Sequence, residues 1–168
     1  HEDIQIEAIP LEDPETLALF AAGDTKGIFQ FEQSGAIRLL RRVQPSCFEE
    51  IVATTSLNRP GASDYIDNFV KRKHGKEKVD MIDPSLEGIL APTYGIMLYQ
   101  EQVMQVAQTF AGFSLGKADI LRRAMGKKNV AEMHRMEDDF IKGAVALGHS
   151  AEKAKKVFAI MEKIAGYG

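Results

Sequence analysis

Signals for the start of a helix recur along this 168-residue sequence and constrain its fold more than any other feature. An N-cap acceptor before a proline, or a Ser or Asn followed three residues later by Glu, satisfies the free N–H groups of a first helical turn. The positions with such a signal are Asp13-Pro14, Ser46 with Glu49, Asp83-Pro84, Asn129 with Glu132, and Ser150, the last as a plain N-cap. We therefore expect helices from one end of the chain to the other.

Apolar side chains repeat with helical spacing behind these signals. The clearest sets are Val103, Val106, Ala107 and Phe110, closed by Gly112, and Ala154, Val157, Phe158, Met161 and Ile164. Strand-like runs are short and isolated, at residues 27–31 and 94–99. The prediction is a mainly α, irregular multi-helix domain of about eight helices, with one or two short extended or strand segments.

Composition limits the class of protein. Hydrophobic residues make up 45% of the chain, which suffices for a core, and the single Cys47 fits a reducing compartment. No apolar run reaches the ~20 residues that span a bilayer, so we expect a cytoplasmic protein with no membrane partner.

The net charge of −3 hides an uneven distribution. The charged residues among positions 1–32 are mostly acidic, eight against one basic. Over residues 33–128 basic residues are in excess, and they cluster at 38–42, 71–78 and 117–128. A mildly acidic chain can therefore present a basic face to phosphates, although a solvated, charge-mixed surface explains the cluster at 71–78 equally well.

Two kinds of catalytic or metal site are disfavoured. Residues 112–116 match G-x-S-x-G, but a helix rather than a strand precedes Ser114, which is better placed as an N-cap than as a nucleophile. The histidines His74, His134 and His149 lack metal-ligand spacing, and we expect them at the surface.

The basic segment that ends at Lys128 is the strongest candidate site. On a helix over residues 115–125, Leu115, Ala118, Leu121 and Met125 share an apolar arc that also contains Arg122. An arginine there needs an anion or a carboxylate as partner. A phosphate suits its forked guanidinium, with Arg123 directed away from the arc and Lys127 and Lys128 adding charge. A structural pair between Arg122 and a carboxylate remains the alternative.

Three weaker candidates accompany this segment. Arg59, at a helix-to-turn junction, suits phosphate positioning or simple capping. Gln100 lies where an extended segment enters a helix, and Tyr167 offers an aromatic ring for base stacking. Each is also compatible with an ordinary helix end.

These residues resemble the alpha subunit of bacterial DNA polymerase III, a C-family replicative polymerase. The matching stretches are residues 8–11, 27–32, 57–61, 72–75, 94–104, 121–128 and 165–168. They occur in the family's order and cover most of the chain. The long block at 94–104 and the basic block at 121–128 are the most specific of them.

The resemblance implies a DNA-directed DNA polymerase as the parent protein. In the family, metal-binding aspartates lie in the palm, so the Mg²⁺ cofactor is expected outside this chain, which has no metal site or catalytic residue of its own. The fingers approach the incoming nucleotide and the template, so Arg122, Arg123, Lys127, Lys128, Arg59, Gln100 and Tyr167 inherit nucleotide or DNA contacts. Primed DNA template and deoxynucleoside triphosphates are the implied partners. Other replisome subunits, including the sliding clamp, are expected to bind elsewhere in the parent.

The same resemblance sets the expected boundaries. Residues 1–12 would be the exit from the palm, and residues 13–168 the fingers, truncated at their C-terminal side. Ala62 replaces a proline that the family usually has, and a pocket segment that follows Gly168 in the family is absent. The excerpt alone is therefore expected to be inactive.

Two other functions make different predictions. A stand-alone helical nucleic-acid-binding module would bind DNA in a salt-sensitive way without catalysis. A hydrolase would lose esterase activity on Ser114→Ala.

Overall fold

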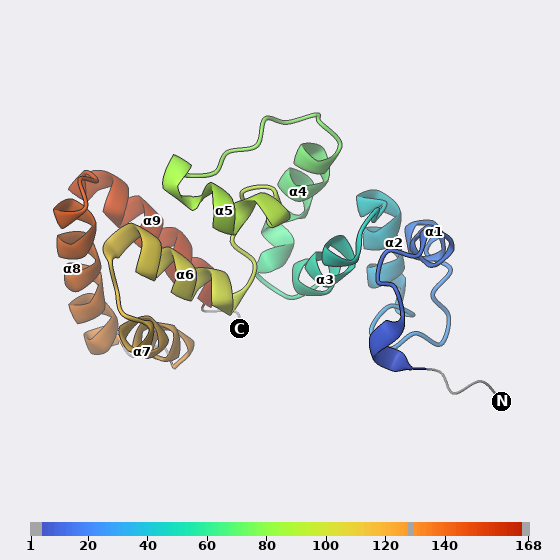
Figure 1. The fold of residues 1–168 in the computed structure, drawn as a ribbon, viewed down its shortest axis with the longest axis horizontal. Helices are drawn as coiled ribbons and strands as arrows, with labels where there is room; N and C mark the ends of the chain where they lie inside the picture. The colour runs from blue at the N-terminus through green and yellow to red at the C-terminus, as the bar shows by residue number, and fades with distance from the viewer. Residues whose placement is uncertain (1–4, 128–129, 166–168) are drawn as a thin grey trace. The chain divides into compact units, whose positions relative to one another are not determined.

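A computed structural model describes residues 5–127 and 130–165, and these residues divide into two compact units, His1–Asn58 and Arg59–Gly168. All nine α-helices in the described part of the chain are linked by turns and short 3₁₀ segments (Figure 1). The mainly α prediction is confirmed.

In its described residues, the first unit contains three α-helices and a 3₁₀ turn. Their bounds are η1 Ile6–Ala8, α1 Pro14–Ala22, α2 Ser34–Val43 and α3 Phe48–Leu57. Asp13 caps α1 as expected, its carboxylate accepting the Thr16 N–H at 2.8 Å. Helix α2 contacts both α1 and α3, and its buried Leu40 and Val43 are central to a small core.

The second unit contains the remaining six α-helices of the described chain. The bounds are η2 Ala62–Tyr65, α4 Ile66–Lys73, η3 Pro84–Leu86, α5 Glu87–Leu90, η4 Ala91–Thr93, α6 Gln100–Ala111, α7 Leu115–Gly126, α8 Val130–Ala146 and α9 Ala151–Ala165. Helix α6 lies against α7 and α8, and α8 pairs with α9 (Figure 1). The apolar set predicted for α6 and most of the set predicted for α9 belong to the buried core of this unit, and Ile164 of α9 is partly buried against it.

Aromatic rings join the helices of the second unit. Phe110 of α6 stacks on Phe140 of α8 with 5.9 Å between ring centroids, and Phe140 also contacts Phe158 of α9. His149 stacks on Phe110 at 3.8 Å, and its side chain is only 19% exposed. The expectation of a surface position for His149 is therefore wrong, because this ring packs at the edge of the aromatic core.

The expected strands are not formed within the described residues. Residues 27–31 make consecutive turns in which Ile28 and Phe31 donate backbone hydrogen bonds three residues back, and Gln30 adopts a φ of 67°. Residues 94–99 begin with two left-handed residues and then lead, without a strand partner, into α6. Strand-like composition was misleading here because a single extended run has no neighbouring run to complete its hydrogen bonds.

One capping prediction is shifted by one residue. Helix α3 begins at Phe48, and Glu50, not Glu49, accepts the N–H of Ser46 at 2.6 Å. Ser150 does cap α9, accepting the Lys153 N–H at 3.2 Å. The box predicted at Asn129 lies outside the described residues.

Candidate nucleotide-binding site

Helix α7 carries the strongest of the predicted site residues. Ser114 caps it, its hydroxyl accepting the Lys117 N–H at 3.2 Å, which confirms the predicted capping role. Ala118, Leu121 and Met125 are buried on one face. Leu115 is 63% exposed, so the predicted apolar arc starts one turn later than expected.

Arg122 lies at the edge of that buried face. Its side chain is 31% exposed, and its Nε and Nη2 donate to Oδ1 of Asp119 at 3.1 and 2.8 Å. Its Nη1 donates to Oε1 of Gln100, the first residue of α6, at 3.2 Å. Two predicted site residues separated by 22 positions are therefore in direct contact.

Asp119 also binds the neighbouring arginine. Its second oxygen, Oδ2, lies 2.7 Å from Nη2 of Arg123. Hydrogen bonds from Arg122, together with the charge of Arg123, hold the pKa of the Asp119 carboxyl below its usual value. Asp119 was not among the predicted site residues, although its spacing of three and four from two arginines on one helix is a recognisable signal.

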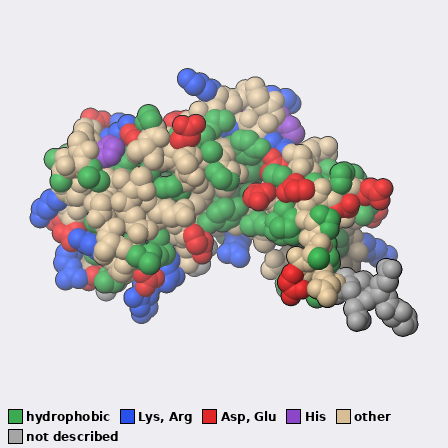
Figure 2. All heavy atoms as spheres, viewed as in Figure 1, with side chains coloured by type: hydrophobic (Ala, Val, Ile, Leu, Met, Phe, Trp, Pro, Cys, Tyr) green, Lys and Arg blue, Asp and Glu red, His purple; other side chains and the backbone are tan. Residues whose placement is uncertain are grey.

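The remaining predicted residues are less well connected. Arg59 and Lys127 are exposed. Among the described residues, the side-chain hydrogen bonds and ion pair of Arg122 go to Asp119 and Gln100 and to neither of these two residues. Lys128 and Tyr167 lie outside the described residues. Figure 2 shows Lys and Arg side chains gathered on the surface where α7 lies.

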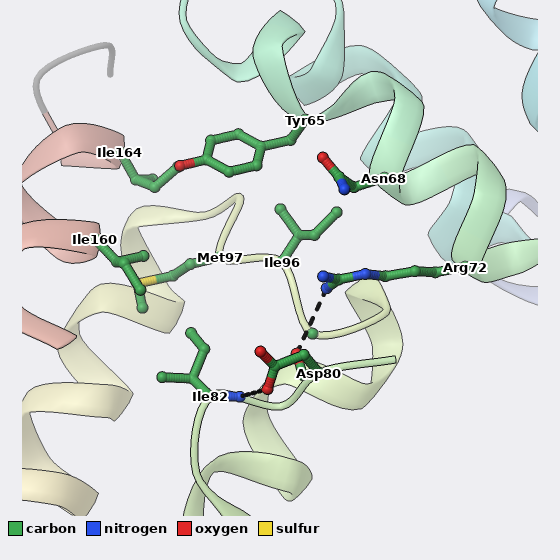
Figure 3. Close-up of a pocket in the computed structure, with 10 residues that line it drawn as sticks. Tyr65, Asn68, Arg72, Asp80, Ile82, Ile96, Met97, Ile160 and Ile164 are labelled. Carbon is green, nitrogen blue, oxygen red and sulfur yellow. Dashed lines mark hydrogen bonds between the residues drawn. The ribbon is translucent and has the colours of Figure 1, made fainter. Parts of the chain in front are cut away.

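A cavity of about 300 Å³ lies elsewhere in the second unit (Figure 3). Its walls are mostly apolar, with polar side chains at one end. The lining residues are Tyr65, Asn68, Arg72, Asp80, Ile82, Gly95, Ile96, Met97, Ile160 and Ile164.

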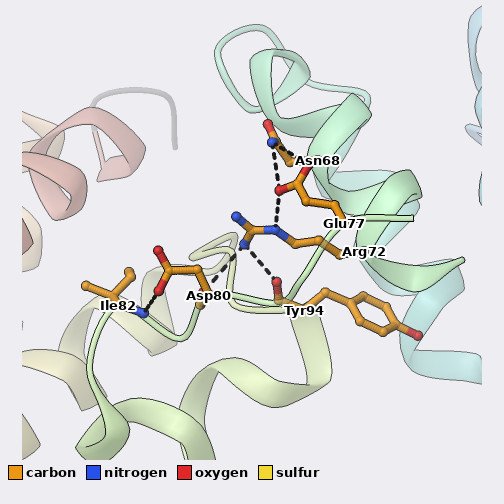
Figure 4. A network of polar contacts seen from close by, with 6 residues as sticks. All are labelled: Asn68, Arg72, Glu77, Asp80, Ile82 and Tyr94. Atoms are coloured by element: carbon orange, nitrogen blue, oxygen red, sulfur yellow. Dashed lines mark hydrogen bonds and ion pairs between the residues drawn. The ribbon is translucent and has the colours of Figure 1, made fainter. Parts of the chain in front are cut away.

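The polar end of this cavity is internally paired (Figure 4). Arg72 donates to Oε1 of Glu77 at 2.8 Å and to the carbonyl of Tyr94 at 3.0 Å. The hydrogen bond from Arg72, with a further one from Asn68, lowers the pKa of Glu77. Gly95 is required beside this network, since its φ is +77° and a Cβ would lie 2.0 Å from the Asp80 carbonyl oxygen. Arg72, one of the basic residues of the cluster at 71–78, is thus held by partners within the protein.

The described residues contain neither a candidate metal site nor a candidate membrane-spanning helix. No group of three or more His, Cys, Asp or Glu side chains there could hold a metal ion. None of the helices described is long and apolar enough to cross a membrane.

Comparison with known proteins identifies the class of the chain. A family model described as the bacterial DNA polymerase III alpha subunit finger domain matches residues 1–148. The chain therefore belongs to the family of bacterial DNA polymerase III alpha subunit finger domains.

Individual relatives carry the same designation. The DNA polymerase III subunit alpha of Streptococcus pyogenes is 70% identical over 98% of this chain, and that match covers 16% of the relative. The subunits of Haemophilus influenzae and Pasteurella multocida are 50% and 49% identical, again over 98% of the chain and 15% of the relative. The chain thus spans about a sixth of the length of these curated relatives.

Proposed function

We propose that this chain binds the triphosphate of an incoming deoxynucleotide, and the nearby template strand, during primer extension by a bacterial replicative DNA polymerase. The observation that carries the proposal is the group on α7, in which two guanidiniums meet at one partly exposed carboxylate. Arginine forks match phosphate oxygens, and several N–H donors of this group remain for a ligand.

The chemical role follows from how phosphoryl transfer is catalysed. Positioning and charge stabilisation dominate this reaction, and metal ions, when bound in the palm, polarise the phosphate under attack. In our proposal Arg122 and Arg123 orient the outer phosphates and stabilise negative charge on the departing pyrophosphate. Lys127, Lys128, Arg59, Gln100 and Tyr167 supply further nucleotide or DNA contacts.

The rest of the machinery is proposed to lie in the part of the relatives that this chain does not span. That part would hold the catalytic aspartates with Mg²⁺ and the surfaces for the sliding clamp. Residues 1–12 would lead in from the palm, and residues 13–168 would belong to the fingers. We place the whole enzyme in the cytoplasm, with its DNA template.

Arg122→Ala in the full-length polymerase tests this proposal. We expect the KM for deoxynucleotide to rise by about tenfold, since a hydrogen bond to a charged group is lost. Steady-state primer extension at varied nucleotide concentration measures the change.

Arg135→Ala is the matched control. Arg135 is 70% exposed and pairs with Glu132 on α8 at spacing i, i+3, as Arg122 does with Asp119. We expect its KM to match that of the wild type. If Arg122→Ala lowered only thermal stability and left KM unchanged, Arg122 would be a structural partner of Asp119 and the proposal would be wrong.

A further inference from the structure

One carboxylate on α7 binds two arginines that the helix itself directs apart. Adjacent residues on an α-helix differ by about 100° in direction, so Arg122 and Arg123 start on different faces. Nη2 of Arg122 nevertheless lies 2.8 Å from Oδ1 of Asp119, and Nη2 of Arg123 lies 2.7 Å from Oδ2. Without this carboxylate, electrostatic repulsion between the two guanidinium groups would keep them apart.

The donors left over define what the group can bind. Oδ1 of Asp119 takes the Nε and Nη2 side of the Arg122 guanidinium, and Gln100 takes one N–H of Nη1. A guanidinium has five N–H donors, so both terminal nitrogens of Arg122 keep one each. The side chain of Arg123, which is 58% exposed, keeps more of its N–H donors available. These donors suit an oxyanion with several oxygens.

We propose that Asp119 is a positioning residue, which gathers Arg122 and Arg123 into a single binding site for the nucleotide triphosphate. This inference rests on the function proposed above and adds a residue to it. Asp119 makes no contact with the nucleotide in this proposal; it acts through the two arginines. Gln100 fixes the Arg122 guanidinium from the other side.

The sign of the expected effect separates this role from a simple charge effect. Removing a negative charge beside a phosphate site would, by electrostatics alone, tighten anion binding. If Asp119 gathers the arginines, Asp119→Asn has the opposite result, because the arginines separate and must be ordered again when nucleotide binds. We expect the nucleotide KM of the full-length polymerase to rise by about three- to tenfold.

Conservative and control variants sharpen the test. Asp119→Glu keeps the charge and the i, i+3 and i, i+4 relations, so its KM should lie closer to that of the wild type than that of Asp119→Asn. Glu152→Gln breaks a pair with Lys156 on α9 whose side chains are more exposed, at 80% and 71%, and it should leave KM unchanged. Melting temperatures of all variants exclude a general loss of folding.

A double-mutant cycle tests directly whether Asp119 holds Arg122 and Arg123 together at one binding site. In the wild-type background, the effects of Arg122→Ala and Arg123→Ala on nucleotide KM should be coupled, because the two side chains share one ligand. In the Asp119→Asn background, the same two effects should become nearly multiplicative. A structural role for Asp119 would not change this coupling.

The outcomes distinguish the two proposals. A KM that falls or stays constant in Asp119→Asn, while Arg122→Ala still weakens binding, overturns the role of Asp119 and leaves the proposed function intact. A constant KM in Arg122→Ala overturns the proposed function and, with it, this inference.

Discussion

Asp83 shows how a single buried carboxylate can tie distant parts of the chain together. Its Oδ1 accepts the N–H and the hydroxyl of Ser85 at 2.9 and 2.7 Å, as the N-cap of η3. Its Oδ2 binds Lys153 of α9, and His149 lies 4.0 Å away. Burial opposes ionisation of Asp83, but the hydrogen bonds from Lys153 and Ser85 outweigh burial and lower its pKa to about 2.

Asp83→Asn is therefore expected to destabilise the chain by about 2 kcal/mol at neutral pH, the free energy that corresponds to this pKa shift. Because the pKa is lowered on folding, the stabilisation is complete above the usual value of 3.8 and is lost as the pH falls through about 2. Urea denaturation at several pH values should show the difference between wild type and variant shrinking between pH ~5 and ~2. A difference that did not depend on pH in this window would contradict the assignment.

At the scale of elements, the approach of α6 to α8 depends on a glycine. A Cβ on Gly143 of α8 would lie 2.1 Å from the carbonyl oxygen of Ala111 at the end of α6. Both partners in this contact are backbone, so neither can move aside by changing a rotamer. The aromatic contact between Phe110 and Phe140 lies between the same two helices.

We expect Gly143→Ala to lower the free energy of unfolding by about 1–3 kcal/mol, because the two helices must separate to accommodate the methyl group. Gly116→Ala on α7 is the matched control, since its Cβ would meet no atom within 4 Å. That substitution should leave stability unchanged or raise it by up to ~1 kcal/mol through helix propensity. Equal effects of the two substitutions in chemical denaturation would show that the contact with α6 is unimportant.

At the scale of the whole molecule, the core is divided unequally between the two units. The large hydrophobic cluster, from Leu86 to Met161, lies entirely within the second unit. The first unit has a smaller set of buried residues and exposes large apolar side chains, including Phe29 at 82% and Ile6 at 76%. A chain of about 60 residues buries too little surface to be more than marginally stable.

A fragment of residues 59–168 should consequently fold alone and unfold cooperatively, whereas a fragment of residues 1–58 should be largely unfolded in isolation. Far-ultraviolet circular dichroism during thermal denaturation of each fragment measures this. A non-cooperative transition for residues 59–168 would show that its core depends on the first unit.

Local signals were enough to predict most of the helices. The caps at Asp13, Asp83, Ser114 and Ser150, and the apolar spacing in α6 and α9, depend on residues within one or two turns of each other. The strand-like runs, such as residues 27–31, were predicted less well. An extended run forms a strand only when a neighbouring segment completes its hydrogen bonds, and local sequence does not show that neighbour.

The basic segment on α7 also combines features that local sequence determines with features that only the tertiary structure determines. Sequence alone determined that Arg122 belongs to an apolar helix face and needs an anionic partner, because helical spacing and the cost of burying a charge are local properties. Only the tertiary structure placed Gln100 against Arg122, since α6 and α7 meet through packing that no local pattern encodes. The side-chain geometry also decided that Arg123 turns toward the same carboxylate as Arg122, because a long flexible side chain follows its nearest opposite charge rather than the direction of its Cβ.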